Sequence, residues 1–193
     1  HDPSASHENG WFVPYGGAPS NYIVKFSSEK HPHLVLIEQL CMSAARASGM
    51  RTCNTFLLSL PHPALCAERF DRAVGQNGKD TGDVGVSDAA KLVDTVRAPL
   101  RLHQEDLSQA FGLLSGSKYV ELEPSTAQAV TAFIRENSTS PAQDIDQFVQ
   151  LVLFNYLIGN CDNHLKNMSV LYQGSGSWIN LAPAYDLVST TLF

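Results

Sequence analysis

The sequence lacks an excess of basic residues, and it lacks a long uninterrupted apolar run. Its 193 residues include 13 Lys and Arg against 19 Asp and Glu, which gives a formal net charge of −6 at pH 7. Surfaces that bind nucleic acids need clustered Lys and Arg, so direct DNA or RNA binding is disfavoured. The most apolar segment, residues 148–158, contains Gln150 and Asn155 and is shorter than the roughly 20 apolar residues of a membrane span. We therefore expect neither a membrane protein nor a direct nucleic-acid binder.

Cysteine is also scarce, and its spacing does not suggest a metal site. The four cysteines, Cys41, Cys53, Cys66 and Cys161, form no C-x-x-C pair. A zinc site or a small disulfide scaffold is therefore disfavoured, and reduced thiols in a cytoplasmic protein are the expected state. Hydrophobic residues nevertheless make up 44% of the chain, which is enough to bury a core.

Strand patterns dominate the first third of the chain, and helical patterns dominate most of the rest. Alternation of apolar residues predicts strands over 21–26, 55–60 and 64–70. Apolar residues at 3/4 spacing predict a helix over 34–48 that Gly49 ends. Later helices are predicted over 104–111, after Ser125 and over 141–157, followed by strands over 168–172 and 178–181. The sequence therefore predicts an α+β fold of two unequal lobes.

The helix over 141–157 has the clearest signals. Ser140 and Gln143 form a capping-box pattern around Pro141. The apolar stripe that we expect to be buried consists of Ile145, Phe148, Val149, Val152, Leu153, Tyr156 and Leu157. The predicted organisation is a β-rich N-lobe portion with a hinge in 1–72, a loop or insertion in 73–99, and a helical C-lobe portion in 100–193.

A polar segment with the parts of a phosphoryl-transfer site follows this helix. Asp162 and Asn167 are five residues apart, the spacing in the kinase catalytic loop, and Lys166 lies between them. Asp186 follows a predicted hairpin, where kinases place a metal-binding carboxylate. Asp162 is thus expected to accept a proton, Lys166 to neutralise phosphate charge, and Asn167 and Asp186 to bind Mg²⁺. Asp and Asn are common in turns, so it is the ordered set, not one pair, that indicates catalysis.

The other half of an ATP site is expected on the N-terminal strands. Lys25 ends the strand Tyr-Ile-Val-Lys, which reads like the kinase strand whose lysine binds the α- and β-phosphates. Glu38, on the next helix, can pair with Lys25, although both side chains can equally face solvent. The segment Glu-Arg-Phe-Asp-Arg at 68–72 closes the last strand, where a kinase has its hinge; a salt-bridged turn is the alternative.

Taken together, these residues resemble the HipA-type serine/threonine protein kinases, which are toxins of bacterial toxin–antitoxin systems. The most specific matches are Leu-Ile-Gly-Asn-Cys-Asp-Asn-His-Leu-Lys-Asn at 157–167 and Pro-Ala-Tyr-Asp-Leu-Val-Ser at 183–189. Further matching segments lie at 23–25, 38–49, 67–72, 104–106 and 111–113. The resemblance implies a protein-kinase-like fold with a β-rich N-lobe and a helical C-lobe.

The resemblance also implies roles for individual residues. Asp162 is the catalytic base, Asn167 and Asp186 bind Mg²⁺, and Lys25 contacts the phosphates of ATP. Glu68 and Phe70 present backbone atoms to adenine. The residues that help to line the nucleotide pocket are His164, Lys166 and Tyr185.

Partners are implied in the same way. Family members phosphorylate a serine of a protein, with aminoacyl-tRNA synthetases among the known substrate types. Many bind a helix-turn-helix antitoxin, so contact with DNA is expected only through that antitoxin. A cytoplasmic location follows from the same resemblance.

The sequence departs from the family at both ends. It begins without Met, and it has no Gly-rich phosphate loop. The resemblance therefore implies a core segment that lacks the family's N-terminal subdomain, its phosphate loop and its C-terminal helices. Two alternatives remain open: a small-molecule phosphotransferase on the same fold, and an inactive remnant that binds nucleotide or antitoxin.

Overall fold

A computed structural model of the chain describes residues 11, 13, 15, 20–59, 61–73, 100–114, 116, 119–173 and 178–191. The N-lobe is a 3-stranded antiparallel sheet on which a helix packs. Its strands are β1 (Tyr22–Phe26), β2 (Thr55–Leu58) and β3 (Ala64–Glu68), in the order β1-β3-β2, and its helix is α1 (Leu34–Ala47). These elements confirm the predicted strands and helix, and α1 buries one periodic face, which consists of Val35, Glu38, Cys41, Met42 and Ala45.

The C-lobe combines a second antiparallel sheet with helices. Its elements are β6 (His103–Asp106), α2 (Leu107–Ala110), α3 (Thr126–Asn137), α4 (Pro141–Leu157), the 3-10 turn η1 (Leu165–Asn167), β7 (Ser169–Gln173) and β8 (Trp178–Leu181). The sheet order is β6-β7-β8, and α3 packs on α4. A short ladder of β4 (Arg72–Ala73) and β5 (Leu100–Arg101) joins the two lobes. Of the predicted insertion 73–99, Ala73 belongs to β4 and residues 74–99 lie outside the described residues.

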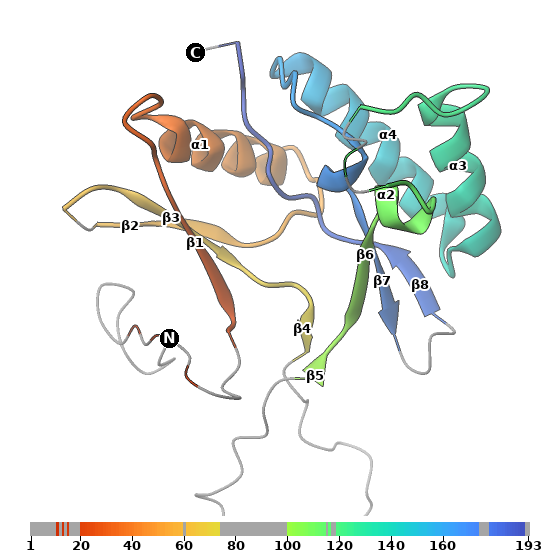
Figure 1. The fold of residues 1–193 in the computed structure, drawn as a ribbon, viewed down its shortest axis with the longest axis horizontal. Helices are drawn as coiled ribbons and strands as arrows, with labels where there is room; N and C mark the ends of the chain where they lie inside the picture. Colours follow the sequence, from red (N-terminus) through yellow and green to blue (C-terminus); the bar gives the residue numbers. More distant parts are fainter. Residues whose placement is uncertain are drawn as a thin grey trace, which may run out of the picture.

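A shared apolar core holds the two lobes together. Met42 and Ala45 of α1 lie in the same buried cluster as Phe148 and Leu151 of α4 and Leu187 of the C-terminal segment. That segment passes between α1 and α4 in Figure 1. A parallel bridge between Thr52 and Ala184 ties it to the chain that leaves α1. The position of α1 is therefore set by the C-lobe as well as by its own sheet.

The predicted helix over 104–111 is wrong in its first half. Residues 103–106 form strand β6, with Glu105 opposite Val170 and Asp106 opposite Ser169 of β7. The helix begins only after Asp106, whose carboxylate accepts from the Gln109 backbone N–H in a capping box. Pairing with a strand far along the chain outweighs the local helical pattern, since local propensity contributes only tenths of a kcal/mol per residue.

The predicted buried face of α4 is wrong for most of its residues. Phe148 is buried and Ile145 partly buried as predicted, but the other five are exposed: Val149, Val152, Leu153, Tyr156 and Leu157. The helix instead buries Leu151 and three polar residues, Asp144, Gln147 and Asn155. The buried Asp144 carboxylate accepts from the Leu181 N–H at 2.9 Å and from Ser138 Oγ at 2.7 Å, and it pairs with Arg51. Burying a polar group costs little free energy when it is hydrogen-bonded. The available hydrogen-bond partners, and not hydropathy alone, therefore determine which face of α4 is buried.

The predicted capping box at the start of α4 does not form either. Among the described residues, the Ser140 side chain makes no capping hydrogen bond. Instead, Ser138 Oγ accepts from the Ser140 N–H at 2.9 Å while donating to Asp144. The Ser138 hydroxyl therefore links the backbone of the N-cap residue Ser140 to the buried Asp144 carboxylate.

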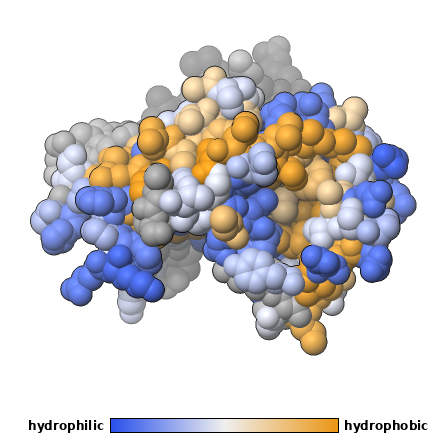
Figure 2. Space-filling model, turned by 90° about the horizontal axis from the view of Figure 1, so that it is seen from above, coloured by the Kyte–Doolittle hydropathy of each residue, from blue (hydrophilic) through white to orange (hydrophobic). Residues whose placement is uncertain are grey.

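Exposed apolar side chains gather on the face formed by α1 and α4. Figure 2, seen from that side, shows a broad apolar band. The exposed large apolar residues of the two helices are Leu36, Leu40, Val149, Val152, Leu153 and Leu157. Within the described segments, no helix has the length and hydropathy that crossing a bilayer requires.

Candidate active site

Lys25 lies at the centre of an ion-pair network between the lobes. Its ammonium group contacts the Glu38 carboxylate of α1 at 2.7 Å and also pairs with the Asp186 carboxylate of the C-terminal segment. The Lys25 and Glu38 side chains are 31% and 9% exposed, so this pair is shielded from water. The predicted pairing of Lys25 with Glu38 is confirmed, and the surface alternative is excluded for Glu38.

Burial and charge act in opposite directions in this network. Burial by itself would lower the pKa of Lys25, but the Asp186 and Glu38 carboxylates outweigh it and hold that pKa above its usual value. Burial raises the pKa of Glu38, and the Lys25 charge opposes this effect. Lys25 therefore stays charged, as a phosphate-binding lysine must.

The network forms one wall of a cleft between the lobes. The cleft has a volume of about 410 Å³. Its lining includes five of the residues that sequence analysis selected: Lys25, Glu68, Phe70, Tyr185 and Asp186. The volume falls within the range of about 300–1,000 Å³ for small-ligand pockets.

The hinge segment lines this cleft with four consecutive residues, 68–71, of which three are charged. The Glu68 N–H donates to the Asn54 carbonyl at 2.9 Å, and its carboxylate accepts from Asn54 Nδ2 at 2.9 Å. Burial would raise the pKa of Asp71, but hydrogen bonds from Arg69 and the charge of Arg72 hold it below its usual value. The Asp71 carboxylate thus links the side chains of Arg69 and Arg72 within the hinge.

The segment carrying Asp186 is strained and well anchored. Asp186 has a φ of 55°, in the left-handed region that Asp tolerates better than most residues. The preceding Tyr185 donates its hydroxyl to the Lys166 carbonyl at 3.0 Å and lies 2.6 Å from Ser169 Oγ. Its ring packs on Phe70, with centroids 5.6 Å apart. Tyr185 therefore connects the hinge, Asp186 and the loop that carries Lys166.

The loop with Asp162 begins where α4 ends. Gly159 has a φ of 65°, and a Cβ at this position would lie 2.6 Å from Thr191 Cγ2. A buried pair of asparagines follows: Asn160 Nδ2 donates to Asn155 Oδ1 at 2.7 Å, and Asn160 Oδ1 accepts from the Asp162 N–H at 3.1 Å. The buried end of α4 thus directly positions the backbone of Asp162.

The Asp162 carboxylate is held at the surface of this loop. Its side chain is 46% exposed, and His164 Nε2 lies 3.7 Å from its Oδ1. Tyr119 Oη donates to the same oxygen at 2.5 Å. Asn167 Nδ2 donates to the Asp162 backbone carbonyl at 2.9 Å, which closes the loop. The carboxylate is accessible and can accept a proton from a hydroxyl placed beside it.

The structure brings five of the nine selected residues into the cleft and leaves four outside its lining. Asp162, His164, Lys166 and Asn167 share the loop after α4, which Tyr185 joins to the cleft. None of these four is among the cleft's described lining residues, and His164 instead lines a second cavity. Its 6% exposed side chain has, within the described part of the chain, no hydrogen-bond partner for Nδ1.

Sequence analysis missed the residues that hold this site in place. Asn155 interrupts an apolar segment, and an amide within an apolar helix was a usable signal of a buried hydrogen bond. Tyr119 comes from the loop ahead of α3, and no local pattern distinguishes it.

The residues predicted to bind Mg²⁺, Asn167 and Asp186, carry oxygen atoms of the kind that this ion prefers. The Asp186 carboxylate is 42% exposed, and the Asn167 amide is oriented by its bond to the Asp162 carbonyl. Mg²⁺ prefers one or two protein oxygens together with substrate phosphates and waters. An amide oxygen and a half-exposed carboxylate provide that donor set.

Comparisons with known proteins agree with this geometry. The sequence matches the HipA-like C-terminal domain over residues 5–193. It is 32% identical over 191 residues to the serine/threonine-protein kinase toxin HipA of Shewanella oneidensis, covering 92% of this chain and 39% of that protein. It is 30% identical over 182 residues to Y4mE of Sinorhizobium fredii, covering 94% of this chain and 38% of that protein. The chain thus spans well under half the length of these relatives.

Solved structures give the same result. HipA of Shewanella oneidensis, in a complex with HipB and operator DNA, matches with a TM-score of 0.70 and 29% identity over 90% of this chain and 38% of that one. The proinflammatory kinase CtkA of Helicobacter pylori shares the fold, with a TM-score of 0.56 and 16% identity over 87% of this chain and 50% of that one. Because the domain match covers nearly the entire sequence, the chain belongs to the HipA-like C-terminal domain family and has a kinase-like two-lobed fold.

Proposed function

We propose that this chain forms the core of an ATP- and Mg²⁺-dependent serine/threonine protein kinase of the HipA type. The observation that carries the proposal is the simultaneous pairing of Lys25 with Glu38 and Asp186. Protein kinases require a lysine–glutamate pair and a metal-binding aspartate to be in place together. The kinase relatives and the fold support the same reaction class.

Each part of the reaction has a residue suited to it. Adenine binds at the hinge beside Glu68 and Phe70, and Lys25 binds the phosphates. Asn167 and Asp186 hold Mg²⁺, which when bound neutralises charge on the transferred phosphoryl group. Asp162 accepts the proton of the acceptor hydroxyl. The oxygen of that hydroxyl attacks the γ-phosphorus, and ADP leaves. Lys166, on the same loop, offsets charge that develops during transfer.

The substrate and partners that we propose come from the resemblance to the HipA-type kinases. We expect it to act as a toxin that phosphorylates a serine of a cellular protein, such as an aminoacyl-tRNA synthetase. The solved HipA structure contains HipB and operator DNA, which supports a helix-turn-helix antitoxin as partner here. With a net charge of −6, this chain would reach DNA through that antitoxin.

Transfer of labelled phosphate tests the proposal. The chain is incubated with γ-labelled ATP and Mg²⁺, alone, with a bacterial protein extract, and with a panel of sugars and aminoglycosides. Label should enter a protein at serine, and Asp162→Asn should lower the rate about 10²–10⁴-fold. Asp146→Asn, an exposed carboxylate on α4, is the matched control and should not change it. Labelling of a sugar or aminoglycoside, or equal rates for both variants, would contradict the proposal.

A further inference from the structure

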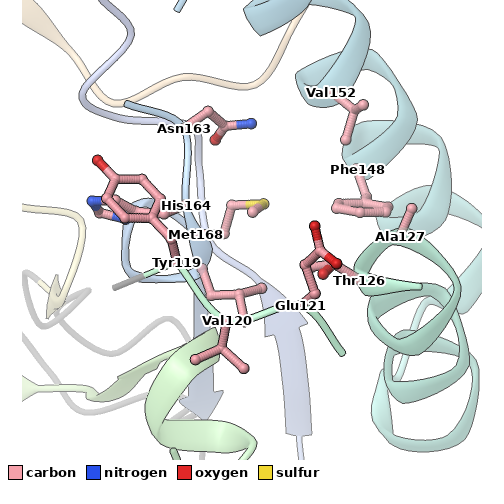
Figure 3. A pocket seen from close by; sticks show the side chains of 11 residues that line it. Tyr119, Val120, Glu121, Thr126, Ala127, Phe148, Val152, Asn163, His164 and Met168 are labelled. Atoms are coloured by element: carbon pink, nitrogen blue, oxygen red, sulfur yellow. The ribbon is translucent and has the colours of Figure 1, made fainter. Parts of the chain in front are cut away.

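A second cavity lies next to the loop that carries Asp162, because two of its lining residues, Tyr119 and His164, contact the Asp162 carboxylate. It has a volume of about 380 Å³ and, among the described residues, shares no lining side chain with the inter-lobe cleft. Figure 3 shows it between the 119–121 segment, the loop after α4, and the facing sides of α3 and α4. A cavity of this size next to a candidate base is a candidate site for the phosphoryl acceptor.

Tyr119 indicates where the acceptor hydroxyl would lie. Its Oη donates to Asp162 Oδ1 at 2.5 Å, and its ring meets His164 edge-on with centroids 5.6 Å apart. An acceptor hydroxyl must make the same contact with a general base, at a distance of about 2.6–3.2 Å. Since Tyr119 is 67% exposed and also lines the cavity, a substrate that displaces its hydroxyl would enter with flanking residues in the cavity.

The cavity's lining has a definite chemistry. Phe148, Val152 and Met168 provide apolar walls, and the Glu121 carboxylate points into the space between Phe148 and Met168 (Figure 3). Its described lining contains no lysine or arginine. A side chain with a long methylene stem and a cationic end matches both features, because the stem can pack on the apolar walls while the charge meets Glu121 and the Phe148 ring.

We propose that this cavity binds a lysine or arginine side chain next to the phosphorylated serine or threonine of a protein substrate. The inference rests on the proposed kinase function and adds a substrate class to it. The two carboxylates, Glu121 and Asp162, favour a basic segment and disfavour an acidic one.

Transfer to a peptide library tests the predicted preference. Each peptide carries a central serine and one fixed neighbour among otherwise mixed residues. Arginine or lysine at one flanking position should raise kcat/KM about tenfold over alanine, from a half-exposed ion pair together with stem packing. Glu121→Lys should abolish this preference and favour aspartate there, whereas Glu136→Lys, an exposed charge reversal on α3, should keep it. A library without flanking preference, or a preference that survives Glu121→Lys, would overturn the inference.

Binding can be measured without turnover, which separates this inference from the proposed function. The chain has three methionines, of which Met168 lines the cavity, whereas Met42 and Met50 are not among its described lining residues. In methyl-labelled protein, N-acetyl-arginyl-serinamide should shift the Met168 signal and leave the other two in place. N-acetyl-aspartyl-serinamide should shift none.

The two experiments fail in distinguishable ways. A Met168 response to the arginine probe without phosphate transfer to any peptide or protein would overturn the kinase proposal and support the cavity. Transfer to all peptides alike, or equal Met168 responses to both probes, would overturn the cavity's assignment and leave the kinase proposal intact.

Discussion

Replacing Lys25 with Met removes the charge at the centre of the inter-lobe network and keeps the apolar stem. The variant leaves the Glu38 carboxylate, 9% exposed, without the ammonium group that lies 2.7 Å away. Breaking a fully buried pair costs about 3–5 kcal/mol. Lys25 is 31% exposed and Glu38 can take up a proton, so we expect a loss of about 1–3 kcal/mol. For a chain of this length, that corresponds to a Tm lower by about 2–12 °C.

The loss should depend on pH in a defined direction. Burial already raises the pKa of Glu38 above its ordinary value of 4.5, and Lys25 is what opposes this rise. Without Lys25, the folded state holds the Glu38 proton to higher pH than the unfolded state does. A group with a raised folded-state pKa destabilises the fold as pH rises through that pKa. The free energy of unfolding of Lys25→Met should therefore fall as pH rises from the ordinary pKa of a glutamate through the raised pKa of Glu38 in the folded state.

Thermal unfolding from about pH 5 to about pH 8 measures this effect. The double variant Lys25→Met/Glu38→Gln should recover stability and lose the added pH dependence, because a neutral amide needs no counterion. Asp186 is 42% exposed, so its own loss of a partner should contribute little. Lys30→Met, at an exposed lysine, is the control. Equal Tm values for Lys25→Met and the natural chain, or no recovery in the double variant, would refute the reasoning.

Three further predictions concern the loop after α4 and the proposed Mg²⁺ site. Gly159→Ala should destabilise the protein more than Gly112→Ala in urea unfolding: both have positive φ, but only the first places a Cβ 2.6 Å from Thr191, whereas the second meets no described atom within 4 Å. Similar losses would contradict the steric argument. Asn160→Ala should cost about 1–3 kcal/mol, because it removes the donor to the buried Asn155 oxygen; an unchanged denaturation midpoint would show that water replaces it. Calorimetry should find weak Mg²⁺ binding without ATP and tighter binding with it, and tight binding to the free protein would count against Asn167 and Asp186 as a shared phosphate-dependent site.

Local patterns were sufficient where residue propensity and spacing along the chain mark an element. β1, α1 and β3 appear where alternation and 3/4 spacing predict them, and Gly49, with a φ of 90°, ends α1. The residues of segments 157–167 and 183–189 were also sufficient to predict the family, because such motifs are recognised from residue types that lie close together in the chain. The domain match then confirmed that prediction.

Local patterns failed where a distant partner decides the outcome. Residues 104–106 form a strand because β7 lies beside them, and α4 turns Asp144 and Asn155 inward because Arg51, Leu181 and Asn160 satisfy them. A hydropathy pattern does not predict which buried polar groups will form hydrogen bonds with residues far along the chain. The same limit hid Tyr119, whose contact with Asp162 joins residues 43 positions apart.

The sequence by itself determined the chemistry of this protein: which carboxylates, amides and lysines are present, in what order, and on which kinds of element. The tertiary structure decided which of these groups meet. In the folded chain, Lys25 lies between Glu38 and Asp186. His164 and Glu121 line the second cavity, next to the loop that carries Asp162. Spacing along a chain specifies neighbours within one element, whereas contacts between elements depend on how buried surfaces and hydrogen bonds are satisfied across the whole fold.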